Sequence, residues 1–220
     1  DFLQSKTAAD LRGKVQLIFT SPPFPLNRKK KYGNLKGEEY VRWLSDFGKP
    51  LGRLLKPGGS IVMEVGNSWV PGKPVMSTLA LQALLGCMQE GELHLGQQFI
   101  CYNPARLPSP AQWVNVERIR VKDAFTHVWW MSRSERPKAN NREVLRPYSK
   151  SMQVLLKTGK YNAGKRPSGH DIGSSSFLTD NSGAIPSNVL VISNTRTGDE
   201  YQKYCRRYGI PLHPARMQPE

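Results

Sequence analysis

The segment VQLIFTSPPF, residues 15–24, constrains the fold of this chain more than any other stretch of its sequence. Residues 15–20 have the apolar and β-branched composition of a buried strand. Pro22 and Pro23 follow, and because each proline lacks a backbone N–H and holds φ near about −65°, the strand must end there in a rigid, extended turn. This turn carries a hydroxyl group, on Ser21, and an aromatic ring, on Phe24.

Helices and strands alternate through the rest of residues 1–132. Residues 37–55 have helical periodicity, which Pro50 and Gly52 should bend or interrupt. A Pro-Gly-Gly turn then leads into a short strand at Ile61–Val65. Further along the chain, the pattern predicts a helix at 77–88 and strands at 97–102 and 125–131. This alternation is typical of a doubly wound sheet, so the fold class that we expect is α/β.

The pattern changes near residues 132–138. Beyond Arg133 the sequence becomes rich in Gly, Ser, Asn and Pro, and residues 167–188 show no clear helix. We therefore expect an ordered front part followed by an irregular region. With 220 residues and 38% hydrophobic composition, the chain is long enough for one domain, or one and a half.

Composition argues against several classes of protein. No apolar run approaches the roughly 20 residues of a membrane span, and the first residues lack the profile of a secretion signal, so we expect a cytoplasmic protein with no membrane partner. The cysteines are odd in number and have no C-x-x-C or Cys/His spacing, which predicts buried thiols rather than disulfides or a metal site. They are Cys87, Cys101 and Cys205.

The charge of the chain indicates a polyanionic partner. The formal net charge is +15, and neutralising phosphates with such cations releases counterions, which favours nucleic acid binding. Residues 133–166 carry ten basic side chains against only Glu135 and Glu143. So few counter-charges indicate a binding surface rather than a solvated basic face.

The turn after the first strand has the chemistry to hold a nucleobase. In doubly wound sheets, ligands bind beyond the carboxyl ends of the strands, which is where Ser21 to Phe24 should lie. A hydroxyl and rigid proline carbonyls accept hydrogen bonds from an amino group, and Phe24 offers a face for stacking. A base reaches such a pocket only when it is flipped out of the duplex, which requires phosphate contacts nearby. The cations that follow the turn are placed to supply them: Arg28, Lys29, Lys30 and Lys31.

These residues resemble a known family. TSPPF is similar to the (Ser/Asp/Asn)-Pro-Pro-(Tyr/Phe) motif of amino-directed DNA methyltransferases, and its serine form is similar to the cytosine-N4 branch. Further segments resemble members of the permuted β group in the same order along nearly the whole chain: LKPGGSIVMEVGNSW, NPARLPSPAQWVN, RIRVKDAFTHVWWMSRSERPK, RPSGHDIG and HPARM. The fold that this resemblance implies is a partial, Rossmann-like methyltransferase sheet with an irregular target-recognition region.

The resemblance implies an activity and residue roles. The implied reaction is transfer of a methyl group from S-adenosylmethionine to N4 of a flipped cytosine in double-stranded DNA. The implied enzyme is part of a restriction-modification system and is cytoplasmic, associated with the prokaryotic nucleoid. Ser21 and the carbonyl of Pro22 would accept the amine hydrogens, Pro23 would complete the motif, and Phe24 would stack on the base. The implied cofactor-binding residues are Thr20, Ser21, His213, Pro214 and Arg216. The implied DNA-binding residues of the recognition side are Arg166, Ser168, His170 and Asp171.

The family's order of motifs implies the arrangement of the chain. Residues 1–134 correspond to the catalytic region, 135–209 to the target-recognition region and 210–220 to the start of the cofactor-side segment. The glycine turn that holds most of the cofactor is expected after this segment, so we expect a fragment or one part of a split enzyme that works with a complementary C-terminal segment or subunit. An unpaired edge beside the Ser21 strand follows from this expectation.

Several alternatives stay open at this point. The chain is either a methyltransferase or a non-catalytic DNA-binding fragment of one, and the target base is cytosine or, alternatively, adenine at N6. The implied target is a CAGCTG-like palindrome. Asp1 is either an acidic residue of the site or part of a frayed terminus, and His170 and Asp171 are either base readers or ordinary turn residues. Trp129, Trp130 and His127 are interpreted as core residues.

Overall fold

The computed structural model describes residues 2–25, 35–193 and 200–211. Residue contacts divide the chain into two compact units, one of residues 1–138 with 188–220 and one of residues 139–187. The functional division into 1–134, 135–209 and 210–220 remains a prediction. No helix among the described residues is long and apolar enough to cross a membrane.

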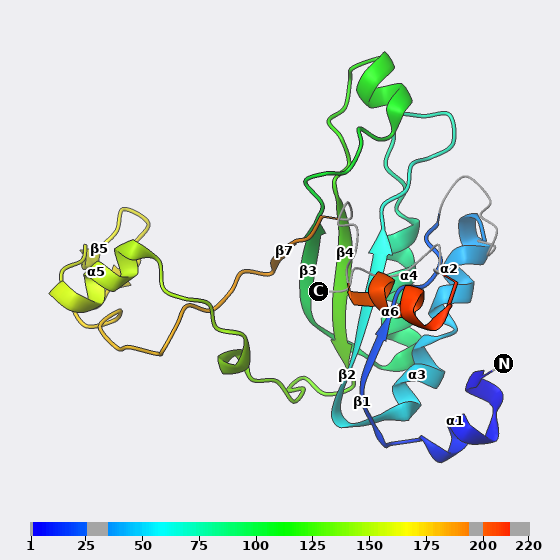
Figure 1. Cartoon of the computed structure of the whole chain (residues 1–220), viewed down its shortest axis with the longest axis horizontal. Coiled ribbons are helices and arrows are strands. Elements are labelled where there is room, and N and C mark those ends of the chain that lie inside the picture. The colour runs from blue at the N-terminus through cyan, green and yellow to red at the C-terminus, as the bar shows by residue number, and fades with distance from the viewer. Residues whose placement is uncertain (1, 26–34, 194–199, 212–220) are drawn as a thin grey trace. The chain divides into compact units, whose positions relative to one another are not determined.

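The first unit is built on a five-stranded sheet with the order β1-β2-β4-β3-β7 (Figure 1). The strands are β1 (Val15–Thr20), β2 (Leu55–Gly66), β3 (His94–Tyr102), β4 (Phe125–Ser132) and β7 (Val189–Val191). β1 pairs with β2, and β3 with β7, in parallel, whereas β4 is antiparallel to both β2 and β3. The α/β class is confirmed, but the sheet is mixed, because β3 and β4 are joined directly by a loop and strands joined in this way run antiparallel.

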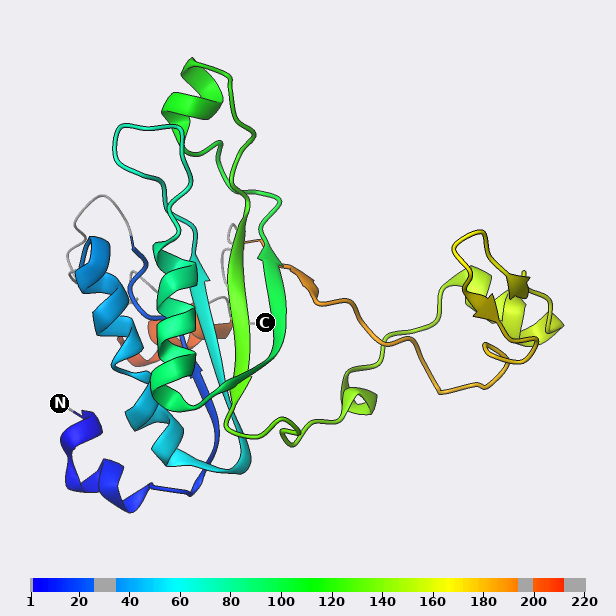
Figure 2. The ribbon, with the colours of Figure 1, turned by 180° about the vertical axis from the view of Figure 1, so that it is seen from behind.

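Three helices cover one face of this sheet (Figure 2). They are α2 (Gly37–Ser45), α3 (Gly48–Leu54) and α4 (Leu79–Gly91). The helix predicted over residues 37–55 is interrupted, as expected, but at Asp46 and Phe47 rather than at Pro50. Pro50 lies in the first turn of α3, where the N–H that proline lacks has no partner within the helix.

The core lies between β2, β4 and these helices. Ile61, Met63 and Val65 alternate along β2 and are fully buried on the helix side of the sheet, where they pack with Trp129 of β4 and Tyr40 of α2. The prediction that Trp129 belongs to the core is confirmed, while Trp130 is half-buried on the opposite face. All three cysteines are free and buried, as the sequence predicted.

The Pro-Gly-Gly segment before Ile61 is not a separate turn, which corrects the sequence-based prediction. It lies inside β2, where the pairing with β1 jumps from Val15 opposite Leu55 to Leu17 opposite Ser60. Gly58 has φ +73°, and a Cβ on Gly59 would lie 2.9 Å from the carbonyl oxygen of Val15. The segment is therefore a bulge, which requires glycine because of its left-handed backbone and its close contact with β1.

The remaining elements are short. Those of the first unit are η1 (Phe2–Gln4), α1 (Lys6–Asp10), η2 (Gln112–Val116) and α6 (Glu200–Tyr208). The second unit contains η3 (Asn141–Val144), α5 (Lys150–Thr158) and a two-stranded sheet of β5 (Gly164–Lys165) and β6 (Asp171–Ile172). An edge-to-face contact between Tyr161 and Phe177 packs the loops of this unit together.

Candidate active site

The turn Ser21–Phe24 lies at the end of the main sheet where β1, β2 and β3 finish, together with the starts of two other loops. Thr20, the last residue of β1, pairs with Met63 of β2. Gly66, at the end of β2, pairs with Thr126, and Tyr102, at the end of β3, pairs with Phe125. The carboxyl ends of β1, β2 and β3 therefore lie at the same end of the sheet. The turn and the loops of residues 67–78 and 103–124 continue from these strand ends.

Contact with Gly66 holds the aromatic residue of the turn in place. A Cβ built on Gly66 would lie only 2.5 Å from Cδ2 and 2.6 Å from Cε2 of Phe24, so the phenyl ring lies directly on the backbone of β2. Phe24 is half-buried and packs against the core. Gly66 was not predicted from the sequence, although a glycine at the end of a buried strand is a signal of close backbone approach.

A groove of about 660 Å³ runs along β1 and ends at the turn. Thr20, Ser21, Pro22 and Pro23 line this end, and apolar side chains of η1, α2, α3 and β1 line the rest. No charged side chain lines the groove among the described residues. The predicted residues of the turn therefore face a common hollow, whose walls are otherwise suited to flat or apolar groups.

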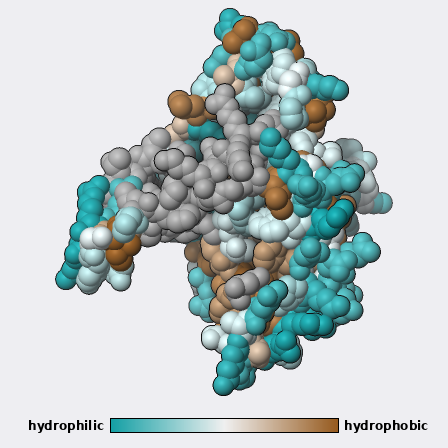
Figure 3. All heavy atoms as spheres, turned by 90° about the vertical axis from the view of Figure 1, so that its right-hand side faces the viewer, coloured by the Kyte–Doolittle hydropathy of each residue, from teal (hydrophilic) through white to brown (hydrophobic). Residues whose placement is uncertain are grey.

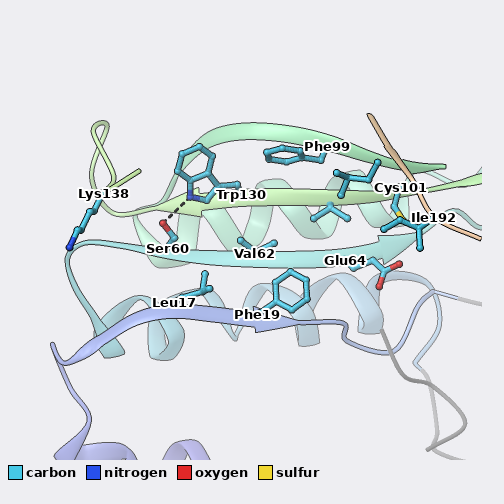
Figure 4. A pocket seen from close by; sticks show the side chains of 12 residues that line it. Leu17, Phe19, Ser60, Val62, Glu64, Phe99, Cys101, Trp130, Lys138 and Ile192 are labelled. Atoms are coloured by element: carbon cyan, nitrogen blue, oxygen red, sulfur yellow. Dashed lines mark hydrogen bonds between the residues drawn. The ribbon is translucent and has the colours of Figure 1, made fainter. Parts of the chain in front are cut away.

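A second hollow, of about 400 Å³, lies on the sheet face that α2, α3 and α4 leave open (Figure 4). Apolar side chains from adjacent strands point into it, among them Leu17, Phe19, Val62, Phe99 and Ile192. Trp130 Nε1 donates a hydrogen bond to Ser60 Oγ at 2.8 Å on its floor, and Glu64 accepts one from Thr126 Oγ1 at 2.9 Å. The open face is thus apolar with few polar groups.

β1 is an edge strand of the sheet among the described residues, but it has the side chains of an internal strand. Leu17 and Phe19 are 56% and 57% exposed, and the strand has no charged residue that would discourage further pairing. Natural edge strands are usually protected by charges, prolines or bulges. This edge of the sheet is therefore suited to further polypeptide.

A chain of hydrogen bonds lies beside the end of β2. Gln98 Nε2 donates to His127 Nδ1 at 2.7 Å, and His127 Nε2 donates to Asn67 Oδ1 at 2.9 Å. Asn67 Nδ2 in turn donates to Asp123 Oδ1 at 2.9 Å. This pattern assigns the neutral His127 with its proton on Nε2.

The surroundings of His127 favour that neutral form. Burial lowers the pKa of His127 below its ordinary value of 6.5, although the carboxylate of Asp123 opposes this shift. The ring is stacked on Trp129. The interpretation of His127 as a core histidine with its hydrogen bonds satisfied is confirmed.

The same hydrogen bonds join the end of β2 to the loop of residues 103–124. Asn67 directly follows Gly66, on which Phe24 packs, and Asp123 lies at the end of that loop. Arg106 forms an ion pair with Asp123 at 3.9 Å and donates to the carbonyl oxygen of Phe125 at 3.2 Å. This group of residues was not predicted from the sequence, because its members are separated along the chain and have no shared periodicity.

The other predicted site residues belong to the second unit or lie outside the described residues. Ser168, His170 and Asp171 are exposed around the β5–β6 hairpin of the second unit, where the backbone N–H of half-buried Arg166 donates to the carbonyl oxygen of His170 at 2.7 Å. The structure therefore groups these four DNA-binding candidates within the second unit. Outside the described residues lie Asp1, Arg28, Lys29, Lys30, Lys31, His213, Pro214 and Arg216.

Known proteins resemble this chain, one of them over most of its length. A family model described as DNA methylase matches residues 15–217. The Type II methyltransferase M.PvuII of Proteus hauseri is 45% identical over 205 residues, which cover 92% of this chain and 61% of that protein. The Type II methyltransferase M.BglII of Bacillus subtilis is 42% identical over 53 residues, 24% of this chain and 14% of that protein.

A solved structure supports the same relationship. The PvuII DNA methyltransferase, described as cytosine-N4-specific, superposes with a TM-score of 0.66 and 34% identity, covering 97% of this chain and 64% of that one. The chain thus spans less than two thirds of the length of this structure and of M.PvuII. The observed α/β sheet matches the fold of this relative.

Proposed function

We propose a role for this chain, which belongs to the DNA methylase family. It provides the catalytic turn and the DNA-reading surface of a site-specific DNA methyltransferase. The proposed product is N4-methylcytosine in duplex DNA, within a restriction-modification system. The observation that carries the proposal is the Ser21–Phe24 turn, held at the carboxyl edge of the sheet by the packing of Phe24 on Gly66. Such rigid placement suits a reaction that depends on positioning.

The roles of the turn follow from its hydrogen-bonding capacity. The Ser21 hydroxyl and the Pro22 carbonyl would accept hydrogens of the target amine, which directs the nitrogen lone pair toward the methyl donor. The exposed part of the Phe24 ring would stack on the flipped base. S-adenosylmethionine, when bound, would supply the methyl group, and the amine nitrogen would release one proton as its new bond to carbon forms.

The described residues fit only part of this cofactor. Thr20 and Ser21 border an apolar groove that accepts a flat ring or a methyl group, but the groove has no charged lining side chain for the cofactor's amino-acid end. We therefore propose a complementary segment or subunit that extends the sheet beyond β1 and contributes the missing polar groups. The exposed Leu17 and Phe19 of β1 support this proposal.

DNA recognition is assigned to two groups of residues. Arg28, Lys29, Lys30 and Lys31 follow the turn in sequence and would bind phosphates, whereas Arg166, Ser168, His170 and Asp171 would contact base edges. The exposure of Ser168, His170 and Asp171 on the hairpin supports the second assignment. His213, Pro214 and Arg216 are retained as proposed cofactor-side residues.

The target base is proposed to be cytosine rather than adenine. Both bases have an exocyclic amine, so the turn alone accepts either. The serine at position 21 resembles the cytosine branch, and the relative with 34% identity is described as cytosine-N4-specific. Nucleoside analysis of the methylated product distinguishes N4-methylcytosine from N6-methyladenine.

The test combines this chain with the part of M.PvuII that lies beyond the matched region and supplies labelled S-adenosylmethionine with a CAGCTG duplex. We expect methyl transfer by the combination and a loss of about 100-fold or more on Ser21→Ala, because one positioned hydrogen-bonding group is worth that much in comparable sites. DNA binding by the chain alone should survive the substitution. Unchanged turnover of Ser21→Ala would exclude this role, and DNA binding without any methyl transfer would favour the non-catalytic alternative.

A further inference from the structure

Asn67, the residue that follows Gly66 at the end of β2, has no role in the proposed function. The loops of residues 67–78 and 103–124 project at the top of the molecule, and hydrophobic and hydrophilic side chains are interspersed on that surface (Figures 1 and 3). Asn67 lies beneath it, because both Asn67 and its hydrogen-bond partner His127 are only 7% exposed. The Asn67 amide is therefore directed at the protein itself rather than at an external ligand.

The partners of Asn67 allow only one orientation of its amide group. A carboxylate only accepts hydrogen bonds, so Asn67 Nδ2 must face Asp123, at 2.9 Å, and Oδ1 must face His127, also at 2.9 Å. Nδ1 of His127 is then left as an acceptor, and Gln98 donates to it. Turning the amide over would oppose an oxygen to the carboxylate and lose both bonds. Asn67 is thus held from two sides in a single orientation.

The two partners anchor Asn67 to different parts of the first unit. His127 belongs to β4, and its ring is stacked on the fully buried Trp129. Asp123 belongs to the loop of residues 103–124, where Arg106 is its ion-pair partner at 3.9 Å and its side chain is only 10% exposed. Because both partners are themselves held, the position of Asn67 is fixed by the core on one side and by a loop on the other.

The peptide bond between Gly66 and Asn67 transmits this restraint to the Ser21–Phe24 turn. The backbone pairing of β2 with β4 ends at Gly66 and Thr126, and a strand end frays easily unless other contacts hold it. The Phe24 ring rests on that strand end, with Cδ2 only 2.5 Å from the place of a Cβ on Gly66. The hydrogen bonds of Asn67 therefore hold the support of Phe24 at the point where backbone pairing stops.

We propose that Asn67 is a positioning residue of the methyl-transfer site, which fixes the end of β2 on which Phe24 rests. The inference rests on the proposed function, in which the Phe24 ring stacks on the flipped base. A base that stacks on a displaced ring has its amine displaced from the methyl donor, and a misplacement of about 1 Å can cost about 100-fold in rate. Asn67 acts through Gly66 and Phe24, without contact to the base.

The experiment exchanges the two side chains of the Asn67–Asp123 pair. Asn67→Asp alone opposes two carboxylates, because the amide and the carboxylate now lie 2.9 Å apart, so their hydrogen bond is lost. Adding Asp123→Asn restores a donor and an acceptor in the reverse direction, and leaves a carboxylate oxygen at position 67 to accept from His127. The double variant therefore has the hydrogen bonds and the net charge of the wild type.

Ser132→Ala is the matched control. Ser132 Oγ donates to the carbonyl oxygen of Gly59 at 2.7 Å, which is also a buried side-chain contact between β4 and β2, but at the opposite end of the strands. Asn67→Ala is added because it removes both hydrogen bonds of Asn67 without introducing a charge, so the test remains possible if Asn67→Asp does not fold.

Three measurements are made on the whole chain. Fluorine NMR with para-fluorophenylalanine reports the surroundings of Phe24, whose signal is assigned by its loss in Phe24→Leu. Urea unfolding gives the stability of each variant. The values of kcat and KM for a CAGCTG duplex are measured in combination with the part of M.PvuII that lies beyond the matched region.

Asn67→Asp and Asn67→Ala should shift or broaden the Phe24 signal. They should also lower kcat by about 10- to 100-fold, with little change in KM for DNA. Adding Asp123→Asn to Asn67→Asp should restore both the signal and kcat. Ser132→Ala should lower stability but leave the Phe24 signal and kcat at their wild-type values. These results would support the positioning role.

Three other outcomes overturn the role of Asn67. A wild-type Phe24 signal in both Asn67 variants would show that Asn67 does not hold the ring, whatever the activity is. An equal loss of kcat in Ser132→Ala would assign the effect to general stability. If the wild-type combination binds DNA but transfers no methyl group, the proposed function fails and the positioning role fails with it, while the NMR comparison still shows whether Asn67 holds Phe24.

Discussion

The edge of the main sheet and the unit of residues 139–187 are organised in opposite ways. At the sheet edge, Phe24 rests on Gly66 and His127 is joined to Asn67 beside a fully buried core. In residues 139–187, by contrast, no apolar side chain is buried, and even α5 has no buried residue. Hydrogen bonds, among them the β-bridge between Arg146 and Ala184, and the contact between Tyr161 and Phe177 hold this second unit together.

This difference suggests a division between chemistry and recognition. Core packing fixes the Ser21–Phe24 turn before any ligand arrives, which is what the proposed methyl transfer, a reaction based on positioning, requires. A unit without a core has low local stability, so its exposed hairpin is expected to adapt to its partner on binding. The substitutions below test this contrast, in order of decreasing expected effect.

The largest effect is expected from Gly66→Ala. The new Cβ would overlap the ring of Phe24, at 2.5 Å from Cδ2, so the free energy of unfolding should fall by about 1–3 kcal/mol, as for other overpacked sites. Urea unfolding measures this loss. Gly96→Ala is the control, because its Cβ would approach no atom closer than 3.4 Å. Equal stability of both variants would mean that Phe24 is not held by this contact.

A smaller effect is expected from protonation of His127. Burial lowers its pKa below 6.5, so the unfolded chain takes up the proton at a higher pH than the folded chain does. The stability that neutral His127 contributes is therefore complete above the unfolded pKa and is lost as the pH falls from about 6.5 toward the folded pKa. Urea unfolding across this range, compared with His127→Gln, measures the contribution. An identical pH dependence in the variant would contradict it.

The smallest global effect is expected from Ser149→Ala, which removes the N-cap of α5. Ser149 Oγ accepts from the N–H of Met152 at 3.3 Å, and losing a cap costs typically about 1 kcal/mol. Hydrogen exchange of the α5 amides should accelerate, while the main unfolding transition should not move. Ser5→Ala removes the same kind of cap from α1, where Ala8 is buried, and should shift that transition. A shift caused by Ser149→Ala would show that the two regions unfold together.

Much of the fold follows from short-range patterns. The apolar run 15–20 followed by two prolines predicts both β1 and its end, and the helical periodicity of residues 37–55 predicts α2 and α3. The antiparallel position of β4 and the pairing of β7 with β3 were not predicted. Both depend on contacts between distant segments, and a strand of three residues such as β7 is too short to show a period.

The same distinction between short-range patterns and long-range contacts applies to the candidate site. The residue types of the Ser21–Phe24 turn, the net charge of +15 and the family resemblance were available from the sequence by itself, because each depends on neighbouring residues or on composition. Only the tertiary structure showed that Gly66 supports Phe24, that Asn67, His127 and Asp123 form one chain of hydrogen bonds, and that the loop of residues 103–124 starts at the same end of the sheet as the turn. These relations join residues tens of positions apart, and strand register, which is set by the packing of the whole sheet, brings them together.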